Sequence, residues 1–324
     1  MDILFLIGGI AVVILGANWL VDGASAIAKK LGISDIVVGL TIVAFGTSAP
    51  ELTVNIFSAL KGSTDIAIGN VLGSNISNIL LILGITCLIN PVEILTATKW
   101  KEIPFSLLAV LVMGIVSNDV LIDGANSNFI SMIDGFILLS FMTIFMVYTF
   151  EMARRQSNAV PVDIYTTTEG SGSQISLIKA IFFIGLGLLA LFFGGKYLVE
   201  GAVSIAKILG MSEKVIGLTI IAIGTSLPEL ATSAVAAYKK KSDIAVGNIV
   251  GSNIFNVFFV LGTTSVITPI PFDSSVNFDI GVAMIASILL FVTTVTFRKQ
   301  KIDRVEGLIF LSIYTGYIAF SIMG

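Results

Sequence analysis

Histidine is absent from this chain of 324 residues, cysteine occurs once, and charged residues make up only 12% of it. Without histidine the chain can build neither a His-ligated zinc site, nor a Ser-His dyad, nor a histidine proton relay. The single Cys87 lies in an apolar run and cannot form an intrachain disulfide, so we interpret it as a packing residue. The net charge of −3 carries no basic excess, which disfavours nucleic acid as a partner.

Long apolar runs dominate the rest of the sequence. Hydrophobic residues make up 56% of the chain, whereas a soluble domain has about 45–50%. A helix of about 20 apolar residues crosses a bilayer and satisfies its own backbone polar groups. The sequence therefore predicts an all-α integral membrane protein with ten transmembrane helices, at roughly residues 2–21, 37–60, 66–89, 103–117, 129–150, 176–199, 214–238, 243–267, 278–297 and 306–322.

The positions of Lys and Arg predict the orientation, because cytoplasmic loops collect these residues. With both termini extracytoplasmic, all 18 lie in cytoplasmic loops except Lys61, Lys196, Lys207 and Lys214. The first span has no basic segment before it and no cleavage pattern, which indicates a retained helix in a cell (inner or plasma) membrane. Residues 151–175 are rich in Ser, Thr and Gly and are predicted to form a flexible cytoplasmic linker.

The sequence contains an internal repeat. Residues 16–84 match residues 194–262 without gaps at an offset of 178, and about 37 of about 69 positions are identical. The strongest blocks pair GTSAPEL with GTSLPEL, and DIAIGNVLGSNISN with DIAVGNIVGSNIFN. A weaker match of DGFILLS with EGLIFLS extends the duplication, which predicts two five-helix repeats at residues 1–150 and 176–324.

An odd number of spans per repeat places the second repeat in the membrane the other way up. Such inverted repeats are typical of secondary transporters, because two matching halves can exchange outward and inward openings around one central site. A cation channel is the alternative of another class, and it would pass current without a counter-ion. With no His, no paired mid-span Asp and no phosphate-binding loop, we see no catalytic set and expect neither an enzyme nor an ATP-driven pump.

Two glutamates lie alone in the middle of predicted spans. Glu51 is the only charged residue between Asp35 and Lys61, and Glu229 is the only one between Lys214 and Lys239. A charge in a transmembrane helix costs about 2.5–3.5 kcal/mol on insertion scales, and no Lys or Arg lies at matching depth. The pair therefore suggests a mobile cation, either a metal ion or protons; two protonated structural acids are the alternative.

Gly-Thr-Ser-x-Pro precedes each glutamate, and Pro50 and Pro228 each remove a helical hydrogen bond. Each helix should break there and free carbonyls at about Ala44 to Thr47 and Ala222 to Thr225. Freed carbonyls, hydroxyls and carboxylates are the hard oxygen ligands that calcium collects and sodium also accepts. Kinks of this kind also occur without any ligand; two of them with a Glu at the same offset favour a site. The hydroxyls within a turn of the carboxylates belong to Thr47, Ser48, Thr225 and Ser226.

The next span of each repeat carries a polar stripe at i, i+4 and i+8, which lies on one helix face and should face the glutamates. We expect the second and third members of each stripe to be ligands more than the first. The neighbouring glycines also form small-xxx-small patterns, in which Asn and Ser serve helix packing alone. The stripes are Asn70, Ser74 and Asn78, and Asn248, Ser252 and Asn256.

At these residues the chain closely resembles the calcium/cation antiporter superfamily and, within it, the sodium/calcium exchanger family. GTSAPE with GNVLGSNISN and GTSLPE with GNIVGSNIFN match that family's two alpha-repeats, at about residues 39–84 and 217–262. The resemblance implies electrogenic exchange of sodium for calcium by alternating access, with no cofactor. One chain contains the whole predicted site, so a monomer suffices.

The resemblance also implies a ligand set, carried over by position. Glu51 and Glu229 would chelate calcium with the carbonyls of Thr47 and Thr225, and Asn78 and Asn256 would complete the middle of the cluster. Sodium would use the same glutamates together with Ala44, Ser48, Ala222, Ser226, Ser74 and Ser252.

Two departures bear on the coupling ion. The potassium-dependent branch has Asp at the position of Asn256, so potassium co-transport is disfavoured. The proton-coupled branch typically has Glu after its Gly-Asn pair, where this chain has Val71 and Ile249. This disfavours proton/calcium antiport, which stays the alternative within transporters.

Overall fold

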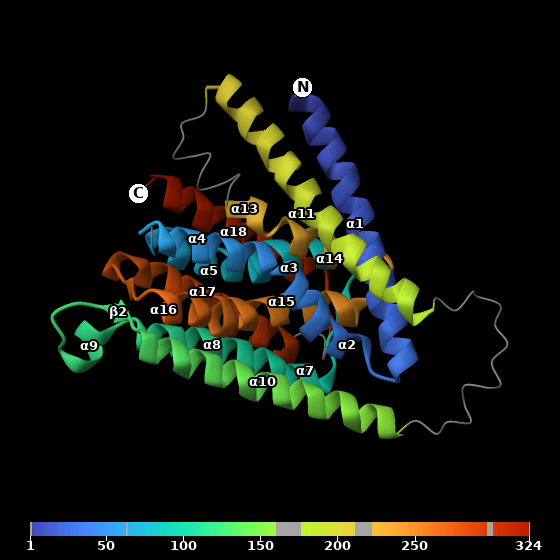
Figure 1. Ribbon diagram of the computed structural model, residues 1–324, viewed down its shortest axis with the longest axis horizontal. Helices are drawn as coiled ribbons and strands as arrows, with labels where there is room; N and C mark the ends of the chain where they lie inside the picture. Colours follow the sequence, from blue (N-terminus) through green and yellow to red (C-terminus); the bar gives the residue numbers. More distant parts are fainter. Residues whose placement is uncertain (1, 63, 160–175, 211–221, 297–300, 324) are drawn as a thin grey trace.

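A computed structural model describes residues 2–62, 64–159, 176–210, 222–296 and 301–323 of the chain (Figure 1). The described part is almost entirely helical. Its first half consists of α1 (Asp2–Leu31), α2 (Asp35–Val38), the π-helix η1 (Gly39–Val43), α3 (Ala44–Thr47), α4 (Ala49–Leu60), α5 (Thr64–Ser77), the π-helix η2 (Asn78–Ile82), α6 (Leu83–Ile89), β1 (Val92–Glu93), α7 (Thr96–Trp100), α8 (Glu102–Val116), α9 (Asp119–Asp123), β2 (Phe129–Ile130) and α10 (Met132–Ala159).

The described residues of the second half form a similar series of elements. It consists of α11 (Leu177–Ile208), α13 (Ala222–Thr225), α14 (Leu227–Tyr238), α15 (Ser242–Ile254), the π-helix η5 (Phe255–Leu261), α16 (Gly262–Ile267), β3 (Ile270–Pro271), the 3-10 helix η6 (Ser274–Val276), α17 (Asn277–Thr296), β4 (Lys301–Ile302) and α18 (Arg304–Met323).

Helices α1 and α11 lie side by side and extend at an angle from the body that the other helices form (Figure 1). Glycines set the close approach: a Cβ on Gly16 would lie 2.8 Å from the carbonyl oxygen of Gly187, and one on Gly23 would lie 2.7 Å from that of Ala180. The residue number in α11 falls as that in α1 rises. The first helices of the two halves are therefore antiparallel.

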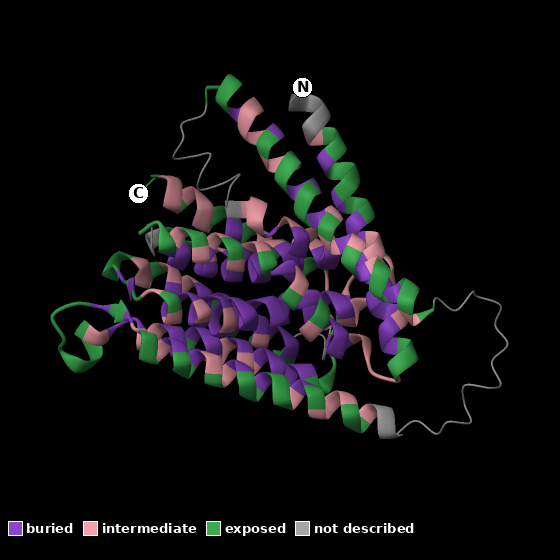
Figure 2. Ribbon diagram, in the orientation of Figure 1, coloured by how far each residue is buried: buried purple, intermediate pink, exposed green. Residues whose placement is uncertain are grey.

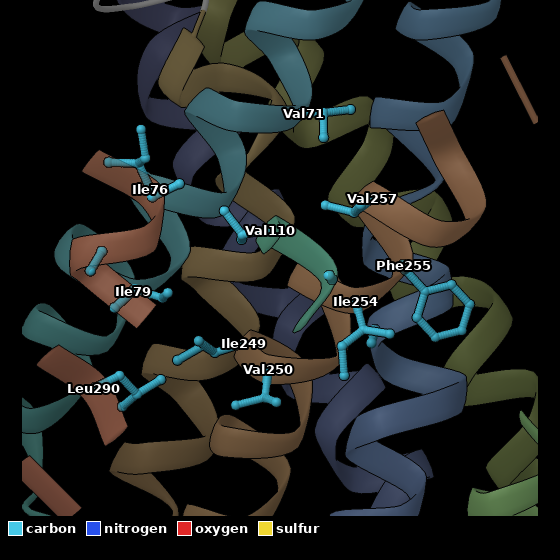
Figure 3. Close-up of a cluster of buried hydrophobic side chains, with 14 of the residues drawn as sticks. Val71, Ile76, Ile79, Val110, Ile249, Val250, Ile254, Phe255, Val257 and Leu290 are labelled. Atoms are coloured by element: carbon cyan, nitrogen blue, oxygen red, sulfur yellow. The ribbon is translucent and has the colours of Figure 1, made fainter. Parts of the chain in front are cut away.

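The centre of the body is formed by α5–η2–α6 and α15–η5–α16. In the most apolar 18-residue stretch of Ser242–Ile267, 94% is buried, and in that of Ile66–Ile89 72% is buried, whereas the share is only 22% in Leu177–Ile208. Figure 3 shows the apolar side chains that fill the space around the two central segments, including Ile76 from α5, Ile254 from α15 and Leu290 from α17. The polar stripes thus lie on the most enclosed helices of the molecule.

Two short strand pairs join the halves reciprocally. β1 pairs antiparallel with β4, with Val92 opposite Ile302, and β2 pairs antiparallel with β3, with Phe129 opposite Pro271. By sequence offset β1 corresponds to β3 and β2 corresponds to β4. The pair β1–β4 and the pair β3–β2 are therefore equivalent contacts with the two halves exchanged.

The prediction of a helical membrane protein is confirmed. The described residues contain seven helices long and apolar enough to cross a membrane, or eight if the bent pair Asp35–Thr47 and Ala49–Leu60 is one span. Of the other two predicted spans, 103–117 corresponds to α8, which has 15 residues, and 214–238 lies partly outside the described residues.

Four boundaries differ from the prediction. α1 continues past the predicted end at residue 21 to Leu31, and α11 continues past 199 to Ile208. Residues 129–130 form strand β2 instead of opening a helix. α10 continues to Ala159, inside the stretch predicted as a linker, of which residues 160–175 lie outside the described residues.

Exposed residues lie along the outer faces of the helices (Figure 2), and many of them are large and apolar. Ile178 of α11 is 82% exposed, and Ile133 and Phe150 of α10 are 73% and 71% exposed. A surface of this kind on helices of span length is compatible with lipid and not with water. The chain is thus a multi-pass membrane protein.

The close approach of α1 and α11 predicts the effect of enlarging Gly16. Gly16→Leu should lower the melting temperature in detergent, because its Cβ would meet backbone atoms of α11 at 2.8 Å and overpacking costs about 1–3 kcal/mol. Gly8→Leu on the same helix is the matched control, since a Cβ there has nothing within 4 Å. Equal melting temperatures for the two variants would contradict the packing argument.

Candidate cation site

Each glutamate follows a break in its helix. Between α3 and α4, Ser48 has φ −82° and ψ 5°, and the segments on either side are bent by 40°. Pro50 occupies the first turn of α4 because its missing N–H costs nothing there, and Glu51 is in the same turn. In the second half Ser226 has φ −86° and ψ 6°, and Glu229 is in the first turn of α14. Both carboxylates thus stand at positive helix ends, which favour negative charge.

Each buried carboxylate has a set of hydroxyl groups around it, and each set contains one hydrogen bond that crosses between the repeats. Ser48 Oγ donates to Glu229 Oε1 at 3.3 Å, so the serine two residues before Pro50 contacts the carboxylate that follows Pro228. Ser226 Oγ donates to Ser74 Oγ at 3.2 Å, and Ser74 Oγ donates to Glu51 Oε1 at 3.5 Å. Ser252, the counterpart of Ser74, donates to Glu229 Oε1 at 3.5 Å. The structure therefore gathers all six of these predicted site residues into one cluster.

The threonines of the two motifs bind the first Asn of the opposite stripe. Thr47 Oγ1 donates to Asn248 Oδ1 at 2.9 Å, and Thr225 Oγ1 donates to Asn70 Oδ1 at 3.3 Å. The amide nitrogen of Asn248 lies 3.3 Å from the carbonyl of Glu229, and that of Asn70 lies 3.4 Å from the carbonyl of Glu51. These two amides thus have protein partners at both ends and brace the site.

One expectation about freed carbonyls is wrong. The carbonyl of Ala44 accepts from the N–H of Ser48 at 3.0 Å and lies 3.3 Å from Thr47 Oγ1, so it is not free in this structure. The helix turns tightly at Ser48 but keeps this bond, and the carbonyl that loses its helical donor to Pro50 is that of Gly46. Ala222, its counterpart, begins α13 directly after residues 211–221, which lie outside the described residues.

Four buried asparagines of the central segments meet between the repeats: Asn78 and Asn256 from the polar stripes, and Asn75 and Asn253 beside them. Asn78 Nδ2 donates to Asn253 Oδ1 at 2.9 Å, and Asn256 Nδ2 donates to Asn75 Oδ1 at 3.1 Å. Asn75 Nδ2 donates to the carbonyl of Asn253 at 3.2 Å, and Asn253 Nδ2 lies 3.4 Å from the carbonyl of Asn75. All four side chains are buried, so these bonds form without competing water.

Four buried oxygens of the cluster have no hydrogen-bond partner. Most buried polar atoms are hydrogen-bonded, and an unpaired one costs about 1–3 kcal/mol. The unpartnered atoms occupy equivalent positions in the two repeats, and all of them are oxygens of the kind that calcium and sodium accept. They are Glu51 Oε2, Glu229 Oε2, Asn78 Oδ1 and Asn256 Oδ1.

The negative charge of the cluster has no fixed counter-charge within the described residues. Neither Glu51 nor Glu229 forms an ion pair there, and no group of three or more His, Cys, Asp or Glu gathers in that part of the chain. A cation bound here would thus be held by two carboxylates and by neutral oxygens. Such a set suits hard cations and not transition metals.

Sequence reasoning missed three features of the site. Asn55 accepts from the amide of Asn70 at 2.7 Å, and its counterpart Ser233 accepts from that of Asn248 at 3.0 Å. The pairing of Asn75 with Asn253 was also not expected. Finally, π-helices begin at Asn78 and immediately before Asn256, and π-helical turns are frequent at functional sites. The repeated GSN triplet was the available signal for the Asn pair.

The sodium/calcium exchanger protein family matches residues 1–151 and 179–323 of this chain. The chain belongs to that family. Its relatives include a putative antiporter, CaxA, of Alkalimonas amylolytica, 40% identical over 97% of this chain and 96% of the relative. The sodium/calcium exchanger MaX1 of Methanosarcina acetivorans is 30% identical over 98% of this chain and 97% of its own.

Solved structures of a sodium-calcium exchanger, NCX_Mj, have the same fold. One obtained with sodium and calcium superposes with a TM-score of 0.80 at 30% identity, covering 98% of this chain and 97% of that chain. One without either ion gives a TM-score of 0.82, covering 98% of both chains. The resemblance stated from the sequence motifs is thereby confirmed.

The missing counter-charge predicts opposite effects of one substitution with and without ions. Glu51→Gln should raise the melting temperature of the ion-free protein, because an uncompensated buried charge costs about 3–5 kcal/mol and Gln removes the charge. It should also abolish the rise in melting temperature that calcium causes. At an intact site, a calcium concentration of 100 times the Kd stabilises the folded protein by about 2.7 kcal/mol. Glu151→Gln, at an exposed ion pair of α10, is the control and should change neither value. A calcium-induced rise retained in Glu51→Gln would contradict the role of Glu51.

Proposed function

We propose that this protein exchanges sodium for calcium across a cell (inner or plasma) membrane, electrogenically and by alternating access. The observation that carries the proposal is the pair of buried carboxylates, Glu51 and Glu229, with one unpartnered oxygen each and no fixed counter-charge in the described residues. The relatives named as sodium/calcium exchangers support the choice of ions.

The proposed ligand set is the one that the motifs indicate. Glu51 and Glu229 bind calcium together with the carbonyls of Thr47 and Thr225, and sodium ions share the same carboxylates. The clustering of the hydroxyls around both carboxylates supports this assignment. The further ligands are Ser48, Ser226, Ser74, Ser252, Asn78, Asn256, Ala44 and Ala222. Ala44 must first release a contact that it makes here.

Charge balance explains why exchange would be obligatory. One calcium neutralises two carboxylates, and several sodium ions on the same oxygens do so too. An empty site keeps a charge of −2 in a low-dielectric interior, which makes an occluded empty state costly and suppresses leak. Competition for one ligand set thus links the two fluxes.

Two inverted repeats of five helices, residues 1–150 and 176–324, provide the proposed alternating access, with residues 151–175 as the cytoplasmic linker. The antiparallel crossing of α1 and α11 supports the inversion, because these are the first helices of the two halves. The reciprocal strand pairs and the reciprocal hydrogen bonds of the site support it as well. We infer ten spans, both termini extracytoplasmic, and a functional monomer.

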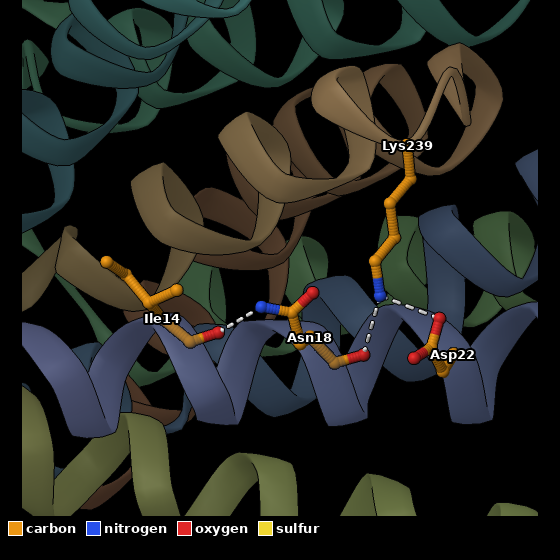
Figure 4. A network of polar contacts seen from close by, with 4 residues as sticks. All are labelled: Ile14, Asn18, Asp22 and Lys239. Atoms are coloured by element: carbon orange, nitrogen blue, oxygen red, sulfur yellow. Dashed lines mark hydrogen bonds and ion pairs between the residues drawn. The ribbon is translucent and has the colours of Figure 1, made fainter.

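The two ends of the α1–α11 pair differ, as a transporter open to one side requires. On α1, Asp22 forms an ion pair with Lys239 at the end of α14 at 2.7 Å, and the same Nζ lies 3.4 Å from the carbonyl of Asn18 (Figure 4). The counterpart of Asp22 is Glu200, which pairs with Lys196 of its own helix at 3.9 Å. Among the described residues, an ion pair of this kind connects α1 to α14 at this end of the α1–α11 pair, and Glu200 at the other end contacts its own helix.

Proton/calcium antiport is the second candidate, since protons could also balance two carboxylates. The neutral Val71 and Ile249 after the Gly-Asn pairs disfavour it. The nature of the driving gradient decides between the two.

Calcium uptake into liposomes tests the proposed exchange. Protein reconstituted in sodium-loaded liposomes and diluted into sodium-free buffer should accumulate radioactive calcium, and Glu51→Gln and Glu229→Gln should reduce uptake to the protein-free background. Potassium-loaded and acid-loaded liposomes serve as controls. Uptake driven only by an acid interior would assign the protein to proton coupling, and uptake without any counter-ion gradient would indicate a channel.

The ion pair between Asp22 and Lys239 lies at one end of the α1–α11 pair and predicts an effect on calcium binding at one face of the membrane. Lys239→Met removes the pair, which is worth about 1 kcal/mol at a half-exposed position, so the conformation open on that face should become about fivefold more populated. The apparent KM for calcium applied from that face should fall by up to about fivefold, whereas Lys196→Met should leave it unchanged. A symmetrical change at both faces would refute the assignment.

A further inference from the structure

Two of the four clustered asparagines present nothing to a cation. Asn75 uses Nδ2 on the carbonyl of Asn253 and Oδ1 on the amide of Asn256. Asn253 uses Oδ1 on the amide of Asn78, and its Nδ2 lies 3.4 Å from the carbonyl of Asn75. Both side chains are 1% exposed. Their oxygens are occupied by protein donors, so they are not candidate ligands in this conformation.

The direction of these amides is set by backbone carbonyls. A backbone carbonyl only accepts, so the side chain that approaches it must do so with its nitrogen. The carbonyl of Asn75 therefore fixes the Asn253 amide with its oxygen toward Asn78, and the carbonyl of Asn253 fixes the Asn75 amide with its oxygen toward Asn256.

The same logic extends one step further. Since Asn253 presents its side-chain oxygen to Asn78, Asn78 must donate to it with its amide nitrogen. The Oδ1 of Asn78 is then left buried and without a hydrogen-bond partner. Asn256 is oriented in the same way by Asn75. Rotating either amide by half a turn would bring two oxygens face to face and present N–H groups to a cation site.

We propose that Asn75 and Asn253 are positioning residues that hold the oxygens of Asn78 and Asn256 available for the transported cation. The proposal rests on the proposed function, because it takes Asn78 and Asn256 as ligands. Each positioning residue acts on the ligand of the other repeat. Partners that orient a metal ligand in this way are typically worth about 10- to 100-fold in metal affinity.

A double-mutant cycle tests this cross-repeat coupling. Asn75→Ala and Asn256→Ala should each raise the KM for calcium by about tenfold, and the double variant should be no worse than either, because they remove one and the same oriented oxygen. Asn75→Ala combined with Asn78→Ala should instead give close to the product of the two effects. Measurements use sodium-loaded liposomes and radioactive calcium.

The control is a second reciprocal amide pair outside the site. Asn118 and Asn277 donate to each other at 2.8 Å in both directions and also join the two halves. Asn118→Ala should lower the melting temperature while leaving the KM for calcium unchanged. If Asn75→Ala behaved in this way too, or coupled equally to Asn78 and Asn256, the residue would be a packing residue and the proposal would be overturned.

A conservative variant covers the case in which Asn75→Ala does not fold. Asn75→Asp keeps an acceptor for the amide of Asn256, so its KM for calcium should stay closer to the wild-type value than that of Asn256→Ala; a value equal to that of Asn256→Ala would overturn the proposal. Failure of the proposed function would look different, because wild-type protein would then show no sodium-driven uptake, or Glu51→Gln would retain it.

Discussion

The molecule is organised around two buried carboxylates that the described part of the protein does not neutralise. Glu51 and Glu229 receive hydroxyl hydrogen bonds and stand at helix N-termini, which lowers the cost of their charge without cancelling it. The breaks at Ser48 and Ser226 place the N-termini of α4 and α14 in the middle of the body. A transported cation, as proposed here, would supply the positive charge that the described residues do not.

The site exists only where the two halves meet. Ser48 reaches Glu229, Thr47 reaches Asn248, and Ser226 reaches Ser74, so neither half alone contains a complete set of partners. The strand pairs and the glycine contacts of α1 with α11 cross between the halves in the same way. A movement of one half against the other would therefore rearrange the proposed ligands, which is what coupling between ion binding and access requires.

The sequence was sufficient for features with strong local causes. A charge in an apolar run and a proline in a helix have consequences that do not depend on distant partners, so both glutamates and both breaks could be predicted. Features set by distant partners could not be predicted. α1 continues through Asp22, which forms an ion pair with Lys239 in the folded protein, and Asn75 donates to the carbonyl of Asn253. The carbonyl of Ala44 was misjudged because the turn at Ser48 keeps one bond that a full break would lose.

The serine hydroxyls give a physical reason why occupancy and conformation are linked. Ser48 donates a hydrogen bond to Glu229 across the repeats in this structure. A hydroxyl has two lone pairs beside its O–H, so Ser48 can keep this contact and still offer a lone pair to a cation. Ser226, which donates to Ser74, makes the equivalent contact from the other repeat. A cation held at the proposed site would therefore add contacts to hydroxyls and carboxylates of both halves, and a ligand shifts a conformational equilibrium only through contacts that differ between the conformations.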